Sequence, residues 1–148
     1  MRIEKDFKEF IELLNKNSVR YLIVGGYAFS FHAEPRFTKG IDFFVEGAEE
    51  NVEKLLNALA GFGFKDIGLA KDDFIKPGYI VQLGVPPVRI DLLTSVSGLD
   101  FAAAWENRVT GNFGGIPAFF ISKVDLIRNK MAVGRKQDLS DIEKLQQI

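Results

Sequence analysis

A short apolar run closed by two glycines, YLIVGG at residues 21–26, places the strongest constraint on the fold. Such a run predicts a buried strand that leads into a turn. The segment YAFSFHA at 27–33 then predicts a short helix, which Pro35 ends. The chain is therefore expected to pass from a buried strand into a helix at Gly25 and Gly26.

Two amphipathic helices are expected, one before the strand at 21–24 and one after a second strand. The first helix has apolar residues at the i, i+3, i+4, i+7 spacing and ends near residues 15–17. IDFFVE at 41–46 predicts a second strand, and residues 49–63 predict a helix that Gly61 and Gly63 stop. The apolar faces of the two helices are Phe7, Phe10, Ile11 and Leu14, and Val52, Leu55, Leu56 and Leu59.

The middle of the chain predicts further strands. FKDIG at 64–68 is a candidate strand, and the alternating runs 79–85 and 88–94 predict a hairpin around the Pro86-Pro87 turn. DFAAAWENR at 100–108 predicts a short helix. IPAFFI at 116–121 predicts a last strand.

Two helices are expected to end the chain. Ser122, with Asp125 three residues later, predicts a capped helix that Gly134 stops. A final helix is expected from near Asp138, with an apolar face of Leu139, Ile142 and Leu145. The pattern predicts one domain over residues 1–148 in the α/β or α+β class, with a mixed central sheet flanked by helices.

Composition limits the classes of function. The 148 residues are 47% apolar, which suits one compact domain, and the net charge of -1 gives no general attraction to nucleic acid or to an anionic membrane. A polyanion would therefore need a local cationic patch. The absence of cysteine excludes disulfides and thiolate metal sites, and no apolar run is long enough to span a bilayer. We expect a soluble, cytoplasmic protein.

Two aspartates inside apolar strands are the first candidates for chemistry. Asp42 lies in IDFF and Asp91 in RIDLL, where an unpaired buried carboxylate would be unfavourable. Each carboxylate either pairs with Arg36, Lys39 or Arg89, or points into solvent on an exposed face of the sheet. Alternatively, the two hold Mg²⁺, which would bridge the phosphates of a nucleotide.

The two glycines are the second candidate. Gly25 and Gly26 would let a ligand approach the backbone closely, and the free N–H groups at a helix start bind phosphate. The pair is also compatible with a merely tight turn. Basic residues near the second strand and in the tail form either a solvated surface or a cationic rim for a triphosphate or an RNA end. They are Arg36, Lys39, Arg128, Lys130, Arg135 and Lys136.

These residues together carry a resemblance to a known superfamily. The stretch VGGYAFSFHAEPRFTKGIDFFVE, the later VRIDLL and the tail SKVDLIRNKMAVGRKQDLSDIEKL resemble nucleotidyltransferases of the polymerase-beta type. The similarity is greatest to small prokaryotic proteins related to the AbiEii toxins and to the minimal nucleotidyltransferases. It implies attack of an acceptor hydroxyl on the α-phosphorus of a nucleoside triphosphate such as ATP, assisted by Mg²⁺, with pyrophosphate leaving. It also implies a protein side chain or a tRNA end as the preferred acceptor.

The resemblance assigns roles to individual residues. It implies that Gly25 and Gly26 cradle the triphosphate, that Asp42 and Asp91 are the second and third metal-binding carboxylates, and that Lys130 or Arg128 faces the phosphates. Arg36 and Lys39 are further candidate nucleotide-binding residues, and Phe37 or Phe43 could stack on the base.

The first carboxylate of the pattern is replaced by Gly40. Positions 40 and 42 of a strand point to one face, so an aspartate at 40 would converge with Asp42. Glu34 could fold back to substitute for it, or water and a substrate phosphate could complete a single-ion site. Three explanations stay open. The protein binds a nucleotide, an RNA or a partner protein without catalysis; or it is an enzyme with a reduced metal site; or residue 40 is an altered position. Oligomeric state and nucleotide preference do not follow from the sequence.

Overall fold

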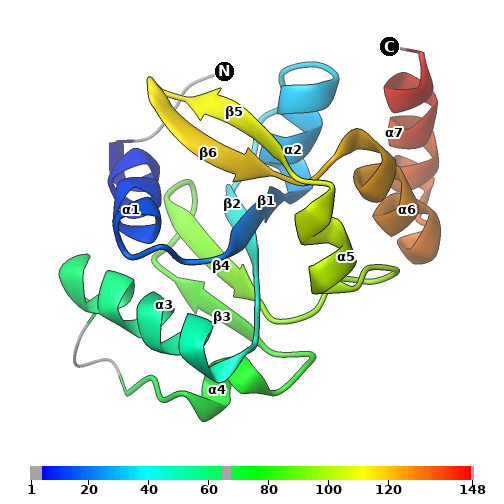
Figure 1. Ribbon diagram of the computed structural model, residues 1–148. Coiled ribbons are helices and arrows are strands. Elements are labelled where there is room, and N and C mark those ends of the chain that lie inside the picture. Colours follow the sequence, from blue (N-terminus) through cyan, green and yellow to red (C-terminus); the bar gives the residue numbers. More distant parts are fainter. Residues whose placement is uncertain (1–4, 65–67, 148) are drawn as a thin grey trace.

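The computed structural model describes residues 5–64 and 68–147, which fold around one mixed sheet (Figure 1). The described residues form seven helices and six strands. In chain order these are α1 (Lys5–Lys16), β1 (Tyr21–Val24), α2 (Gly25–His32), β2 (Gly40–Val45), α3 (Glu49–Gly61), α4 (Asp72–Ile75), β3 (Ile80–Leu83), β4 (Arg89–Leu93), α5 (Phe101–Glu106), β5 (Val109–Phe113), β6 (Ile116–Phe120), α6 (Lys123–Val133) and α7 (Lys136–Gln146).

The sheet has the strand order β3-β4-β2-β1-β6-β5. Strand β2 pairs with β1 in the antiparallel direction and with β4 in the parallel direction, so the sheet is mixed as the sequence predicts. The register places Asp42 opposite Val24, the last residue of β1, and opposite Asp91 on β4. The start of α2 therefore lies beside Asp42, and Asp91 lies one strand further along the sheet.

Each face of the sheet is covered by its own set of helices (Figure 1). Helices α1 and α3 pack on one face, against the β2 side chains Ile41, Phe43 and Val45. Helices α2, α5, α6 and α7 lie on the other face, where Phe44 joins their core. Because successive strand residues point to opposite faces, Asp42 points to the side of Phe44, toward α2.

Most of the predicted elements are confirmed. The hairpin β3–β4, the Asp100-capped helix α5 and the Ser122-capped helix α6 form where the pattern placed them, and Gly134 ends α6 in the left-handed conformation. The central part of the candidate strand at 64–68 lies outside the described residues. The final helix begins at Lys136, slightly before Asp138.

Three features differ from the prediction. One is the short helix α4, which the sequence did not predict. Strand β5 was not expected, although the Gly114-Gly115 pair that joins it to β6 is a typical two-residue hairpin turn. Leu139 is 57% exposed, and only Ile142 and Leu145 of the predicted apolar face of α7 are buried. None of the helices in the described ranges is long and apolar enough to cross a membrane.

Candidate functional site

A pocket of about 300 Å³ lies where the start of α2, the segment 36–40 and the start of α7 meet. It gathers six of the seven residues that the sequence predicts for the site, and Asp91, the seventh, lies next to Asp42 on the neighbouring strand. The lining residues are Gly25, Gly26, Arg36, Phe37, Thr38, Lys39, Gly40, Asp42, Arg89, Lys130, Arg135, Gln137, Asp138 and Asp141. Residues from distant parts of the chain thus form a single site.

The two glycines are required by close contacts. Gly25 has φ of +67°, and a Cβ there would overlap the Asp42 carboxylate. A Cβ on Gly26 would come within 2.5 Å of the methyl carbon of Thr38. Helix α2 has no side-chain cap on its first turn. The N–H groups of Gly25 and Gly26, at the positive end of the helix dipole, can therefore bind an anion at this end of the pocket.

The aspartates form a close acid pair. Asp91 is buried, and Arg89 Nη2 donates a hydrogen bond of 3.1 Å to its Oδ2, with Nε 3.0 Å from Oδ1. Burial, together with the charge of Asp91 and a hydrogen bond between the two carboxyls, raises the pKa of Asp42 to about 7, against a smaller opposing effect of Arg89. Asp91 therefore pairs with an arginine, as one interpretation of the sequence predicts, while Asp42 lines the pocket and Asp91 lies beside it on β4.

Gly40 leaves no room for the carboxylate that the sequence resemblance implies at this position. It lies opposite Arg89 in the β2–β4 pairing, and a Cβ on Gly40 would overlap the Arg89 carbonyl. Glu34 does not replace it, because Lys144 Nζ binds its carboxylate at 2.7 Å. Among the described residues, no group of three or more acidic or histidine side chains could hold a metal ion. Residues 5–64 and 68–147 therefore do not supply the donors of a two-metal site, and Asp42 and Asp91 fit one hard cation at most.

Most cations of the pocket are already paired. Both terminal nitrogens of Arg36 bind Asp141, Nη1 at 2.9 Å, and Lys130 Nζ lies 2.7 Å from the same carboxylate. Arg135 Nε donates to Asp138 at 2.8 Å. Arg128 is not part of the pocket lining and pairs with Asp125.

Lys39 differs from these cations. It is exposed, and it has no ion pair within residues 5–64 and 68–147. Of the cations that line the pocket, Lys39 is the one with no ion pair among the described residues; Lys136, which has none there either, does not line the pocket.

The sequence did not single out Gln137, Asp138 or Asp141 as site residues, and it named Arg89 only as a possible partner of a strand aspartate, which the structure bears out for Asp91. Asp141 is fully buried, and it accepts hydrogen bonds from Arg36, Lys130 and Gln137. Burial raises its pKa, but these three donors together hold that pKa below its usual range. The aspartates of the final helix were visible in the sequence, whereas their partners are set by the docking of α7 on α2 and α6.

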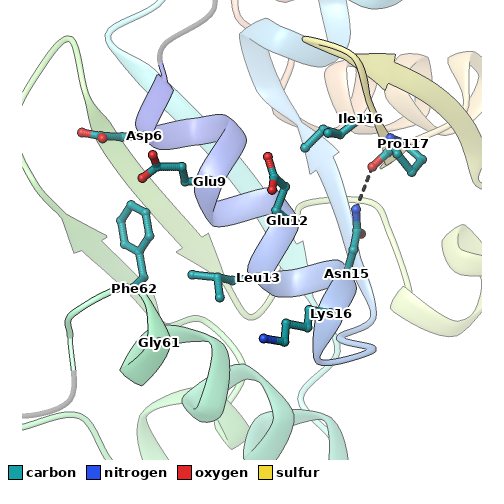
Figure 2. A pocket seen from close by; sticks show the side chains of 10 residues that line it. All are labelled: Asp6, Glu9, Glu12, Leu13, Asn15, Lys16, Gly61, Phe62, Ile116 and Pro117. Carbon is teal, nitrogen blue, oxygen red and sulfur yellow. Dashed lines mark hydrogen bonds between the residues drawn. The ribbon is translucent and has the colours of Figure 1, made fainter.

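A larger pocket lies on the opposite side of the sheet, and it is unsuited to a phosphate. Figure 2 shows this pocket of about 990 Å³, which lies beside α1, the end of α3 and the β5–β6 hairpin. The carboxylates of Asp6, Glu9 and Glu12 lie along α1 on one side of it, and only Lys16 is cationic. A nucleotide triphosphate would be repelled there, so size alone does not identify the site.

The fold and the family together define the class of protein. The mixed sheet with its flanking helices has a nucleotidyltransferase-like fold. The chain belongs to the family described as nucleotidyltransferase of unknown function (DUF6036), whose pattern matches residues 2–148.

A solved structure supports the fold. The chain is similar to an antigenic nucleotidyltransferase-like protein from Paracoccidioides brasiliensis, with a TM-score of 0.58 and 17% sequence identity. The similarity covers 95% of this chain and 74% of that one. No curated protein matches the chain significantly.

Proposed function

We propose that this protein binds a nucleoside triphosphate through its phosphate groups in the 300 Å³ pocket. The observation that carries the proposal is the meeting of the open first turn of α2 with the free charge of Lys39 in one pocket. Backbone N–H groups at a helix start and a nearby lysine are the usual partners of phosphate. Membership of a nucleotidyltransferase family supports the same ligand class.

A divalent cation would enter this site with the nucleotide. Asp42 and Asp91 would hold one Mg²⁺, which when bound neutralises charge on the phosphates. Arg89 already compensates one of the two acids, so the protein attracts a free metal ion less strongly than three carboxylates would. We therefore propose that nucleotide binding, rather than a preformed metal centre, is the main property of the pocket.

Transfer of a nucleotidyl group is the second candidate function. It is favoured by the in-register acid pair, Asp42 and Asp91, beside the proposed phosphate position. The acceptor would be a protein side chain or an RNA end, as the similarity to toxin–antitoxin proteins suggests. Loss of one catalytic electrostatic group lowers rates by on the order of a hundredfold to a thousandfold. With Gly40 in place of a carboxylate, transfer is expected to be slow or absent.

Calorimetric titration tests the binding proposal. Each of the four nucleoside triphosphates is titrated into the protein, with Mg²⁺ and with EDTA. Lys39→Ala is expected to weaken binding several-fold, because it removes a charge-assisted contact with phosphate. Lys76→Ala, an exposed lysine outside the pocket, is the matched control and is expected to bind like the parent. No binding to the parent protein, or equal binding by the Lys39 variant, would refute the proposal.

A labelling assay separates binding from transfer. The protein is incubated with nucleotide labelled at the α-phosphate, in the presence of candidate protein and tRNA acceptors. Label on an acceptor that disappears with Asp42→Asn would establish transfer. Nucleotide binding without any label would leave the protein a nucleotide-binding module.

A further inference from the structure

Phe37 is an apolar ring at the mouth of a polar pocket. It is 83% exposed, the highest value among the large apolar side chains of the described residues, and it lines the same pocket as Gly25, Gly26 and Lys39. Single exposed apolar residues are common and need no function. The surroundings of Phe37 therefore decide whether the exposure has a purpose.

The backbone on both sides of Phe37 is anchored. Arg36 N donates to Ser30 Oγ at 3.2 Å, and the Arg36 guanidinium binds Asp141 and lies 3.9 Å from the centre of the Phe29 ring. On the other side, the Thr38 methyl lies against Gly26, and β2 begins at Gly40. The ring of Phe37 is thus displayed by a segment that is held in place, and not by a loose loop.

The size of the pocket places the base of a nucleotide outside it. About 300 Å³ is the lower end of the range for small-molecule sites, and the lining is largely charged or backbone. Such a pocket suits the phosphates, so the ribose and base of the same molecule would extend to its mouth. Phe43, the other ring considered from the sequence, is fully buried against Phe10 and Tyr21 and cannot serve there.

We infer that Phe37 is the platform on which the base of a bound nucleoside triphosphate stacks. This inference rests on the proposed function, because it takes the phosphates to lie in the pocket between Gly25 and Lys39. Stacking on an aromatic ring tolerates every base, since each base has a flat π face. The site therefore accepts purine and pyrimidine nucleotides alike and has little selectivity for one base.

The test compares complete nucleotides with a ligand that has no base. ATP, CTP and inorganic tripolyphosphate are titrated, under identical Mg²⁺ conditions, into the parent protein and into Phe37→Ala and Phe37→Trp. Phe37→Ala is expected to weaken ATP and CTP about 5- to 150-fold and to leave tripolyphosphate unchanged. Phe37→Trp is expected to bind both nucleotides at least as tightly as the parent. Val85→Ala, which trims another exposed apolar side chain (74% exposed), is the matched control and should bind all three ligands like the parent.

Each other outcome overturns the inference in a recognisable way. If Phe37→Ala binds ATP and CTP like the parent, Phe37 is not the platform, while the proposed function stands. If Phe37→Ala weakens tripolyphosphate as much as the nucleotides, the residue acts on the pocket itself and not on the base. If neither tripolyphosphate nor nucleotide binds to the parent, the proposed function fails and the inference fails with it.

Discussion

Two glycines shape the candidate site at the level of single residues. Gly25 allows the Asp42 carboxylate to approach the start of α2, and Gly40 allows the Arg89 carbonyl to approach β2. In the sequence, Gly40 reads as a missing metal ligand. In the structure it is also the residue that lets β2 and β4 lie close together, so adding a carboxylate there is not a simple restoration.

Gly40→Asp is expected to destabilise the protein. The added Cβ overlaps backbone atoms of Arg89, so the two central strands must shift, and overpacking of this kind typically destabilises by about 1–3 kcal/mol. Urea unfolding monitored by circular dichroism measures the loss. Gly40→Ala carries the same Cβ without the charge and should account for much of the effect. A Gly40→Asp variant as stable as the parent would contradict the steric account and would make restored transfer activity the next measurement.

At the level of secondary-structure elements, the Asp141 carboxylate joins α7 to two other segments of the site. Asp141 on α7 binds Lys130 on α6 and Arg36 in the segment before β2. Lys130 is itself only 8% exposed. Removing the charge of Asp141 would leave a buried ammonium group with Asp138, 3.7 Å away, as its remaining partner in this network.

Asp141→Asn is expected to lower the free energy of unfolding at pH 7 by about 3–5 kcal/mol, the usual loss when one partner of a buried ion pair is removed. Glu143→Gln, on the exposed side of the same helix, is the control and should change stability little. Chemical denaturation at pH 7 measures both. A loss no larger than that of the control would show that the Asp141 network contributes little.

The Asp141 carboxylate is also expected to make the stability of the protein depend on pH. The pKa of Asp141 is lower in the folded protein than in the unfolded chain, so the unfolded chain binds a proton first as the pH falls. The stability that this carboxylate contributes is complete above the unfolded pKa of about 3.9 and is lost progressively below it. The gap in stability between the parent and Asp141→Asn should therefore narrow below about pH 4. A gap that widens on acidification would contradict the assignment.

At the level of the whole molecule, one sheet supplies a wall to both cores. Residues of β1 and β2 alternate between the core under α1 and α3 and the core under α2, α5, α6 and α7. If the sheet unfolds, both cores are exposed to water together. The single domain predicted from the sequence therefore implies one cooperative unfolding transition.

Two probes can check this cooperativity. Trp105, the single tryptophan, stacks with Phe101 and meets Phe119 edge-on, so its fluorescence reports on α5 and β6. Far-ultraviolet circular dichroism reports on all helices and strands. We expect the two denaturation curves to coincide. A loss of helical signal before the fluorescence changes would show that α6 and α7 unfold separately.

Much of the fold and part of the site could be predicted from the sequence, because their signals are local. The strand at 21–24, the amphipathic helices and the Ser122 cap depend on neighbours a few residues away. Asp42 and Asp91 were visible as acids within apolar runs, and the structure does bring them together. Strand β5 was not predicted, because its main local signal is the Gly114-Gly115 turn that follows it and not the periodicity of its own residues.

The sequence by itself thus determined the order of most strands and helices, with β5 and α4 the exceptions, together with the Gly-Gly turn and the two central aspartates. Only the tertiary structure decided which charges remain free: Arg36 meets Asp141 across 105 positions of the chain, and Lys39 keeps no such partner within the described residues. It also decided that Gly40 has no room for a side chain. The physical reason is that local periodicity depends on adjacent residues, whereas ion pairs and steric room depend on segments that meet only when the sheet and α7 assemble.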